Sequence, residues 1–261
     1  MGDAHRSPET QARQRFVDAL PIAEAWVRAG GEFITPVVGS QLDEDVELEN
    51  WRAWHLAHFS LSSGTHHLLA AVRYLLEFGP AALPIHSLMR TALWGGAQGL
   101  WVLHPVEPGE RAARAAQVLG YSVTNHRKWL DTFSDVDPEG SEARAALRAR
   151  LVGLSQELGS QGPNQHQVVR WAGEHVFGDQ PGAVAEVEQG WRELGAVAHA
   201  VPWELSRRPG QVVAGDERVS VRAVRGSSAE LEGVLSHVLG ILEAGWGVFE
   251  ERASTAAVDP T

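Results

Sequence analysis

Arg192 and His199 are spaced so that they could act together on a phosphodiester. They lie seven residues apart in the segment 184–200, whose pattern predicts a helix. Seven residues turn ~700° and rise ~10 Å, so both side chains point to one side of the helix. A neutral imidazole can accept a proton from a ribose hydroxyl, and a guanidinium can hold the phosphate, as metal-free RNA cleavage requires. Alternatively, His199 simply caps the helix, one turn before Pro202.

A second group of residues could line a small-molecule pocket. His86, Arg90, Trp94 and Trp101 fall on roughly one face of the predicted helix Ile85–Leu103. Glycines at positions 95, 96 and 99 lie beside the two tryptophans. The missing side chains permit either close helix packing or a cavity walled by aromatic rings. In a cavity, the histidine and the arginine would be polar anchors, which makes these four the candidate ligand-binding residues.

Four histidines, His55, His58, His66 and His67, suggest a possible metal site. The first two are spaced i, i+3 and could share an ion on one helical face. However, no carboxylate lies one turn away, and His66 would be ~16 Å along the axis from His55 even in a continuous helix. We therefore predict satisfied histidines, no metal site and no cofactor.

Two segments resemble parts of uncharacterised all-helical proteins of actinobacteria. The segment Trp191–Trp203 has their aromatic-Arg pair, followed by small residues, a histidine and Pro-Trp. The segment Leu88–Trp94 is similar to their Leu-x-Arg-x-x-Leu-Glu helix, although Trp94 replaces the glutamate. The resemblance spans about residues 60–205, and any chemistry that needs this carboxylate would be lost or relocated.

The Arg-x6-His spacing is also similar to the Arg-x4–6-His motif of the HEPN superfamily, which includes dimeric, metal-independent ribonucleases of defence systems. This resemblance implies that Arg192 and His199 are a catalytic pair and that the protein cleaves RNA. The chain departs from the family in having Glu193 where Asn, His or Asp is usual, and in being about twice as long as the family's helical core.

Local patterns predict an all-α bundle of about eight helices in a single domain, residues 1–261, with loose tails at 1–8 and 253–261. Asp43–Asp45 is expected to begin a helix because acidic residues favour helix N-termini, and Ser62–Gly64 is expected to interrupt it. Alternating valines predict one small β-hairpin at 211–224. The other expected helices are 8–30, 66–78, 85–103, 108–135, 138–158, 165–176, 184–200 and 227–252.

Composition narrows the function classes. The chain has 22 basic and 33 acidic residues, a net charge of −11, which disfavours a broad nucleic-acid-binding surface. It has no cysteine and no apolar run of membrane-spanning length, so we expect a cytoplasmic protein without a membrane partner. Three classes remain open: a HEPN-like ribonuclease, a small-molecule-binding protein or tailoring enzyme, and a non-catalytic interaction or regulatory protein. We expect a homodimer, with RNA or a small molecule as the candidate partner.

Overall fold

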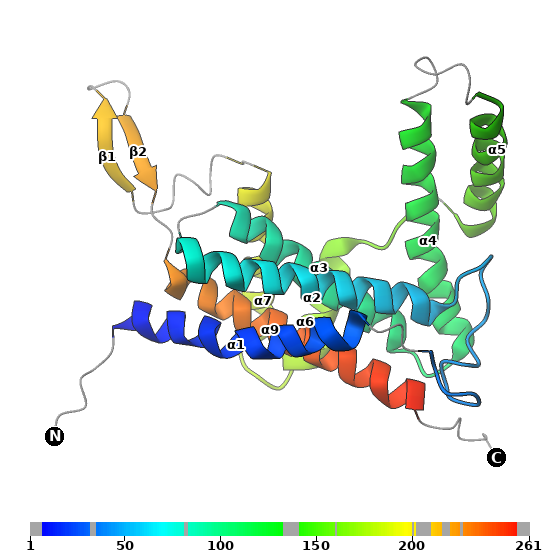
Figure 1. Cartoon of the computed structure of the whole chain (residues 1–261), viewed down its shortest axis with the longest axis horizontal. Coiled ribbons are helices and arrows are strands. Elements are labelled where there is room, and N and C mark those ends of the chain that lie inside the picture. Colours follow the sequence, from blue (N-terminus) through cyan, green and yellow to red (C-terminus); the bar gives the residue numbers. More distant parts are fainter. Residues whose placement is uncertain are drawn as a thin grey trace.

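The computed structural model describes residues 7–31, 35–80, 83–132, 141–159, 161–199, 201, 210–215, 220–224 and 227–254. Within these ranges the protein is a bundle of eight helices, as the sequence predicts (Figure 1). The helices are α1 (Pro8–Gly31), α2 (Ala53–Phe78), α3 (Leu83–Leu103), α4 (Pro108–Asp131), α5 (Ser141–Leu158), α6 (Gln165–Phe177), α7 (Ala183–Ala198) and α9 (Ser228–Ser254). Strands β1 (Gly210–Gly215) and β2 (Ser220–Val224) pair antiparallel, with Gly210 opposite Val224.

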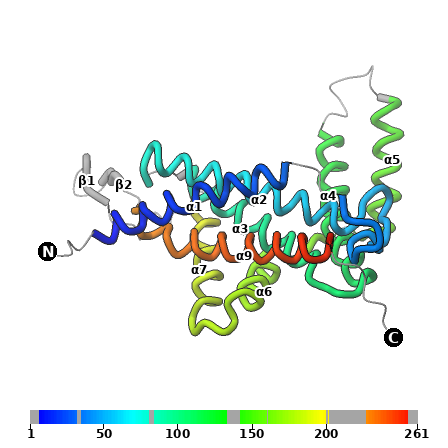
Figure 2. Tube along the Cα trace, turned by 60° about the horizontal axis from the view of Figure 1, so that its bottom comes forward, coloured from blue at the N-terminus to red at the C-terminus, as the bar shows by residue number. Residues whose placement is uncertain are grey.

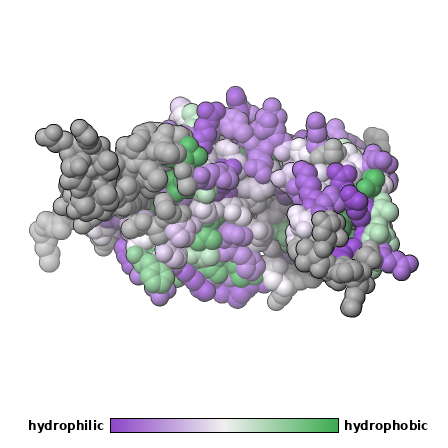
Figure 3. Space-filling model, turned by 90° about the horizontal axis from the view of Figure 1, so that it is seen from above, coloured by the Kyte–Doolittle hydropathy of each residue, from purple (hydrophilic) through white to green (hydrophobic). Residues whose placement is uncertain are grey.

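The long helices α1, α2, α3 and α9 run alongside one another and enclose the main core (Figures 1 and 2). Their fully buried side chains include Phe16, Leu68 and Phe249. Helices α6 and α7 pack against α3 and α9, whereas α4 crosses one end of the bundle and projects from it beside α5. On the face shown in Figure 3, hydrophobic residues are interspersed with hydrophilic ones. Among the described helices, not one combines the length and apolar character that a bilayer span requires.

Helix α2 runs without interruption through Ser62–Gly64, so the expected break is wrong. Gly64 is buried against α3, where an added Cβ would lie 3.0 Å from the carbonyl oxygen of Ala92. Gly95 on α3 is even closer to α2, because its Cβ would lie 2.5 Å from the Ser60 carbonyl oxygen. The close packing of α2 against α3 therefore stabilises the helix by more than the weak helix propensity of glycine destabilises it. At these positions the glycines of α3 serve close helix packing, the first of the two alternatives left open by the sequence.

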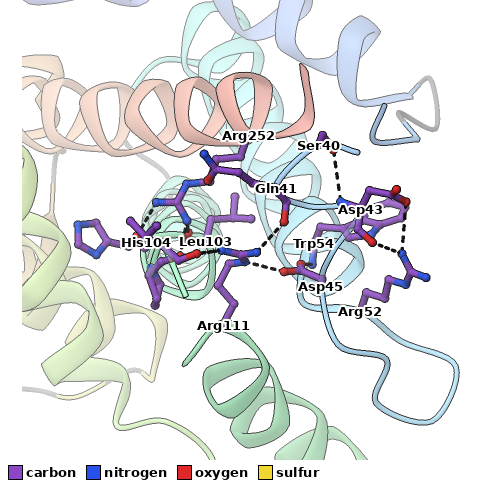
Figure 4. Close-up of polar contacts among 12 residues, drawn as sticks. Ser40, Gln41, Asp43, Asp45, Arg52, Trp54, Leu103, His104, Arg111 and Arg252 are labelled. Carbon is purple, nitrogen blue, oxygen red and sulfur yellow. Dashed lines mark hydrogen bonds and ion pairs between the residues drawn. The ribbon is translucent and has the colours of Figure 1, made fainter. Parts of the chain in front are cut away.

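The acidic segment Asp43–Asp45 does not begin a helix, because α2 starts only at Ala53. Asp45 instead lies in the loop before α2, fully buried, and Arg111 donates from Nε to its Oδ1 at 2.6 Å (Figure 4). Its other oxygen accepts the backbone N–H of Trp54 at 3.2 Å. Burial of both charges is tolerated because they compensate each other. The acidic cluster thus anchors the loop rather than stabilising a helix dipole.

Arg111 and Arg252 together close the carboxyl end of α3 (Figure 4). Arg111 also donates to the carbonyl oxygens of Gln41 at 2.7 Å and Pro105 at 3.1 Å, and to that of Val106. Arg252 donates to the carbonyl oxygen of His104 at 2.7 Å and to those of the two flanking residues. Carbonyls at the end of a helix lack intrahelical partners, so the two guanidiniums satisfy them and join α3, α4, α9 and the loop.

Most other element boundaries agree with the sequence-based expectation to within a few residues. Helix α9 extends through Ser254, two residues into the segment that was expected to be a tail. Helix α1 includes Pro21 without a division into two helices. Residues 133–140, where one helix was expected to end and the next to begin, lie outside the described residues.

Candidate functional site

A groove with a volume of about 650 Å³ lies between α2, α3 and α4. Thirteen residues line it, and none is Asp, Glu, Lys or Arg. Five of them are Phe, Tyr or Trp, and most of the others are aliphatic or neutral polar side chains. The lining residues are Trp51, Leu56, Phe59, Ser60, Trp94, Gln98, Val118, Leu119, Tyr121, Ser122, Asn125, His126 and Trp129.

The walls of the groove come from one face of each helix. Tyr121, Asn125 and Trp129 follow one another at intervals of four residues on α4, a spacing that places side chains on one side of a helix. Phe59 lies opposite on α2 and is 69% exposed, while Trp129 is 56% exposed. Large aromatic side chains seldom gather at the surface unless they contact a ligand or a partner. The groove is therefore the strongest candidate site in the part of the chain that the structure describes.

A buried hydrogen-bond chain links α2 and α3 at the groove. The hydroxyl of Ser60 donates to the carbonyl oxygen of Leu56 at 2.8 Å, and Gln98 donates from Nε2 to Ser60 Oγ at 2.7 Å. Ser60 is buried, whereas Gln98 is half-buried. Both side chains line the groove. The chain places one oriented amide group within an otherwise apolar wall.

Trp51 reaches the groove from a tight turn rather than from a helix. Leu48 and Trp51 exchange two backbone hydrogen bonds, 2.6 and 2.9 Å long, around Glu49 and Asn50. Glu49 has φ +60°, a left-handed conformation that non-glycine residues seldom adopt. Its carboxylate accepts from Arg150 Nη2 on α5 at 3.0 Å. A local strain of this kind persists only where surrounding contacts impose it, and the ion pair with α5 is one such contact.

His55 packs against Trp51 and Trp54. Its imidazole lies 3.7 Å from the ring of Trp54 and contacts Trp51 edge-on at 6.1 Å, measured between ring centroids. Nδ1 accepts the backbone N–H of Arg52 at 2.9 Å, which requires that Nδ1 carry no proton. Burial and, to a lesser extent, the Arg52 charge lower the pKa of His55. The ring is therefore neutral at pH 7 and acts as a packing element.

A smaller cavity of about 250 Å³ adjoins the groove between α4, α5 and the turn that carries Trp51. It shares four lining residues with the groove: Trp51, Leu119, Ser122 and His126. Glu49 and Arg150 also line it. The charged side chains that line these two cavities thus belong to the side cavity, and they pair with each other.

The four residues that the sequence suggested as one ligand site differ in the contacts that they make. Trp94 lines the groove, His86 is buried, and Trp101 lies beneath the guanidinium of Arg114, 5.1 Å from the ring centroid. Arg90 instead covers the ring of Trp191 at 3.5 Å and donates to the carbonyl oxygen of that residue at 3.1 Å. Burial lowers the pKa of Arg90.

Helices α3 and α7 contact each other through this arginine. Trp94 lies 6.3 Å from Trp191, measured between ring centroids. A Cβ at Gly195 would lie only 2.5 Å from Arg90 Nη1. Gly195, about one helical turn after Trp191, thus leaves room for the guanidinium of Arg90, so this part of α7 has a packing role.

Arg192 and His199 are both exposed on α7. Arg192 Nη2 lies 3.4 Å from His166 Nε2, which in turn lies 2.9 Å from a carboxylate oxygen of Glu188. His199 occupies the C-cap position, and its backbone N–H donates to the Gly195 carbonyl oxygen at 3.0 Å. The ribonuclease hypothesis stays a prediction, which cleavage of RNA in EDTA beside a His199→Ala control would test. Pro202 and Trp203 lie outside the described residues.

The histidines of α2 lie in separate environments. His58 packs edge-on against Trp246 at 5.7 Å, whereas the Nδ1 atoms of His66 and His67 bond to carbonyl oxygens one turn earlier, each at 2.8 Å. Within the described ranges, no three His, Asp or Glu side chains are grouped closely enough to hold a metal ion.

Sequence reasoning identified Trp94 but missed the wall formed by α4. The repeat of Tyr121, Asn125 and Trp129 at four-residue intervals could have suggested it. A pattern of this kind is equally typical of a core-facing helix. Only the structure shows that these three side chains of α4 are exposed to solvent.

Comparison with protein-family models, with curated proteins and with solved structures gives no match for this chain.

Proposed function

We propose that the protein binds an uncharged, largely apolar small molecule in the groove between α2, α3 and α4. The observation that carries this proposal is the composition of the lining: five Phe, Tyr or Trp side chains and no Asp, Glu, Lys or Arg among thirteen residues. An ionic ligand would lose its hydration there without gaining a counter-charge. An uncharged aromatic or aliphatic molecule would gain from burial against the rings.

The shape of the groove supports a small ligand. Its volume of about 650 Å³ falls within the range of about 300–1,000 Å³ that is usual for small-molecule sites. A few polar groups placed in an apolar wall are also typical of such sites, since they orient the ligand. Gln98 and Ser60 provide such groups here.

Binding rather than catalysis is what the lining favours. Besides Tyr121, the ionisable side chain in the lining is His126, which is exposed. Acid-base or nucleophilic catalysis requires a nucleophile or proton carrier held by a second oriented group. The polar side chains of the groove instead include a serine whose proton is already donated to the Leu56 carbonyl oxygen.

The test uses N-phenyl-1-naphthylamine, an uncharged fluorophore whose emission rises in apolar sites, and a matched pair of phenylalanine variants. Phe59 lies in the groove and is 69% exposed; Phe78 ends the same helix and is 63% exposed. We expect the wild type and Phe78→Ala to bind the probe equally. Phe59→Ala should bind it at least about fivefold more weakly, because a contact ring is lost. Equal binding by both variants, or no binding by the wild type, would contradict the proposal.

The alternative occupants of the groove are a second copy of the chain and a peptide. Sedimentation velocity of the same three proteins distinguishes the first. If Phe59→Ala dissociates an oligomer that Phe78→Ala retains, the groove is a subunit interface and the small-molecule proposal is wrong.

A further inference from the structure

We infer that the groove selects planar aromatic ligands that carry an N–H or O–H donor, and that the carbonyl oxygen of Gln98 recognises this donor. The inference rests on the proposed function, since it specifies the chemistry of the ligand that the groove takes. Three features carry it: the fixed orientation of the Gln98 amide, the unused acceptor that this orientation leaves, and the aromatic rings beside it.

The orientation of the amide follows from the proton of Ser60. A hydroxyl has one proton, and that of Ser60 is donated to the Leu56 carbonyl oxygen at 2.8 Å within helix α2. Ser60 can therefore only accept from Gln98, so the nitrogen of the amide must face it, as the 2.7 Å contact from Nε2 shows. While Ser60 keeps its bond to Leu56, a flipped amide would set two acceptors against each other in this partly buried contact. That arrangement costs as much as an unsatisfied buried polar group.

This orientation leaves Gln98 Oε1 as the free acceptor. Among the contacts of the described residues, the amide of Gln98 uses its nitrogen toward Ser60, and no donor reaches its oxygen. The side chain is half-buried and lines the groove. A ligand donor that reaches this oxygen would hydrogen-bond to it. A ligand of the same shape without a donor would cover the carbonyl and leave it unsatisfied, which sites of this kind penalise strongly.

The rings next to this amide favour a flat aromatic ligand. Trp94 lies one helical turn before Gln98 on α3, and Phe59 directly precedes Ser60 on α2. Both rings line the same groove as the amide. Stacked or edge-on contacts between rings add to the gain from apolar burial. An aromatic ring with a donor on its edge satisfies both requirements, as indoles and phenols do.

The test compares two isomers of equal size: 3-methylindole, which has an N–H donor, and 1-methylindole, which has none. Each is titrated as a competitor of N-phenyl-1-naphthylamine. We expect the wild type to bind 3-methylindole at least about fivefold more tightly. Gln98→Leu should bind the two isomers equally, and Gln98→Met serves the same purpose if the leucine variant does not fold.

Asn125→Ala is the control, because it removes another neutral amide from the groove. This variant should still bind 3-methylindole more tightly than 1-methylindole.

The outcomes separate this inference from the proposed function. If both isomers displace the probe from the wild type with equal affinity, the groove binds small molecules but Gln98 does not select them, and the inference is overturned. The same conclusion follows if Asn125→Ala, rather than the Gln98 variants, loses the preference. If neither the probe nor either isomer binds, the proposed function itself is wrong.

Discussion

Arg111 Nε donates to Asp45 Oδ1 at 2.6 Å, and both side chains are completely shielded from solvent. The two residues belong to different segments of the chain. Asp45 lies in the loop that leads to Trp51, and Arg111 lies in the first turn of α4. Their ion pair therefore holds the turn with Trp51 in place relative to the helix that carries Tyr121 and Trp129. We therefore expect the groove to lose its shape when this buried contact is removed.

Removal of the carboxylate should destabilise the protein strongly. In Asp45→Ala, the Arg111 guanidinium stays buried without its counter-charge, which costs about 3–5 kcal/mol of unfolding free energy. Urea denaturation followed by Trp fluorescence measures the loss. Glu44→Ala is the control, because Glu44 is an exposed neighbour and should change stability by less than about 0.5 kcal/mol. Similar values for both variants would show that the ion pair is not needed for stability.

Two glycine-to-alanine substitutions should have opposite effects. A Cβ at Gly95 would lie 2.5 Å from the Ser60 carbonyl oxygen and 2.7 Å from backbone atoms of Gly64, so α2 and α3 must move apart. We expect Gly95→Ala to cost about 1–3 kcal/mol. Gly247, on the exposed side of α9, has no atom within 4 Å of such a Cβ. Gly247→Ala should stabilise the protein by up to about 1 kcal/mol, which thermal unfolding of both variants can check.

Stability should decrease as the pH falls from 7 to 5. Burial lowers the pKa values of His58, His104 and His237 in the folded protein; nearby positive charges add to this effect at His58 and His104, whereas the Glu186 carboxylate opposes it at His237. Above the unfolded-state value of about 6.5, these groups are neutral in both states and their contribution is fully present. Below it, the unfolded chain binds protons first, so each histidine lowers the unfolding free energy by up to about 1.4 kcal/mol per pH unit until its folded pKa is reached.

The contribution of one histidine to this pH dependence can be isolated. His58→Gln should flatten the dependence on pH between 7 and 5, because the substituted side chain does not titrate. Ser63→Ala is the control on the same helix, because it removes no titratable group, and it should leave the slope close to that of the wild type. Parallel curves for all three proteins would rule out a role for His58.

The contact of Arg90 with Trp191 should depend on the planar guanidinium. Arg90→Gln removes the cation from a ring at 3.5 Å and the hydrogen bond to the Trp191 carbonyl oxygen. We expect a loss of about 1–3 kcal/mol, and Arg90→Lys should restore little of it because an ammonium does not stack. The exposed Arg192→Gln should be nearly neutral. Chemical denaturation of the three variants checks this order, and full rescue by lysine would contradict the stacking argument.

Helix positions were predictable because local residues mark them. Gly79-Pro80 and His104-Pro105 end helices at the positions where the structure ends α2 and α3. Two predictions were wrong because a contact with a residue far along the chain overrode the local conformational preference. Ser62–Gly64 stays helical because Gly64 packs against α3, and Asp43–Asp45 stays in a loop because Arg111 binds Asp45, 66 positions along the chain.

The candidate site was predictable only in part, for the same reason. The amino-acid sequence by itself determined an all-helical chain with apolar faces, including the position of Trp94 on its helix. Tertiary structure alone decided that Phe59 and Trp129 stay exposed and face one groove, and that Arg90 covers the ring of Trp191. Helical periodicity shows which side chains share a face. Whether a partner helix covers that face depends on long-range packing, which no local pattern records.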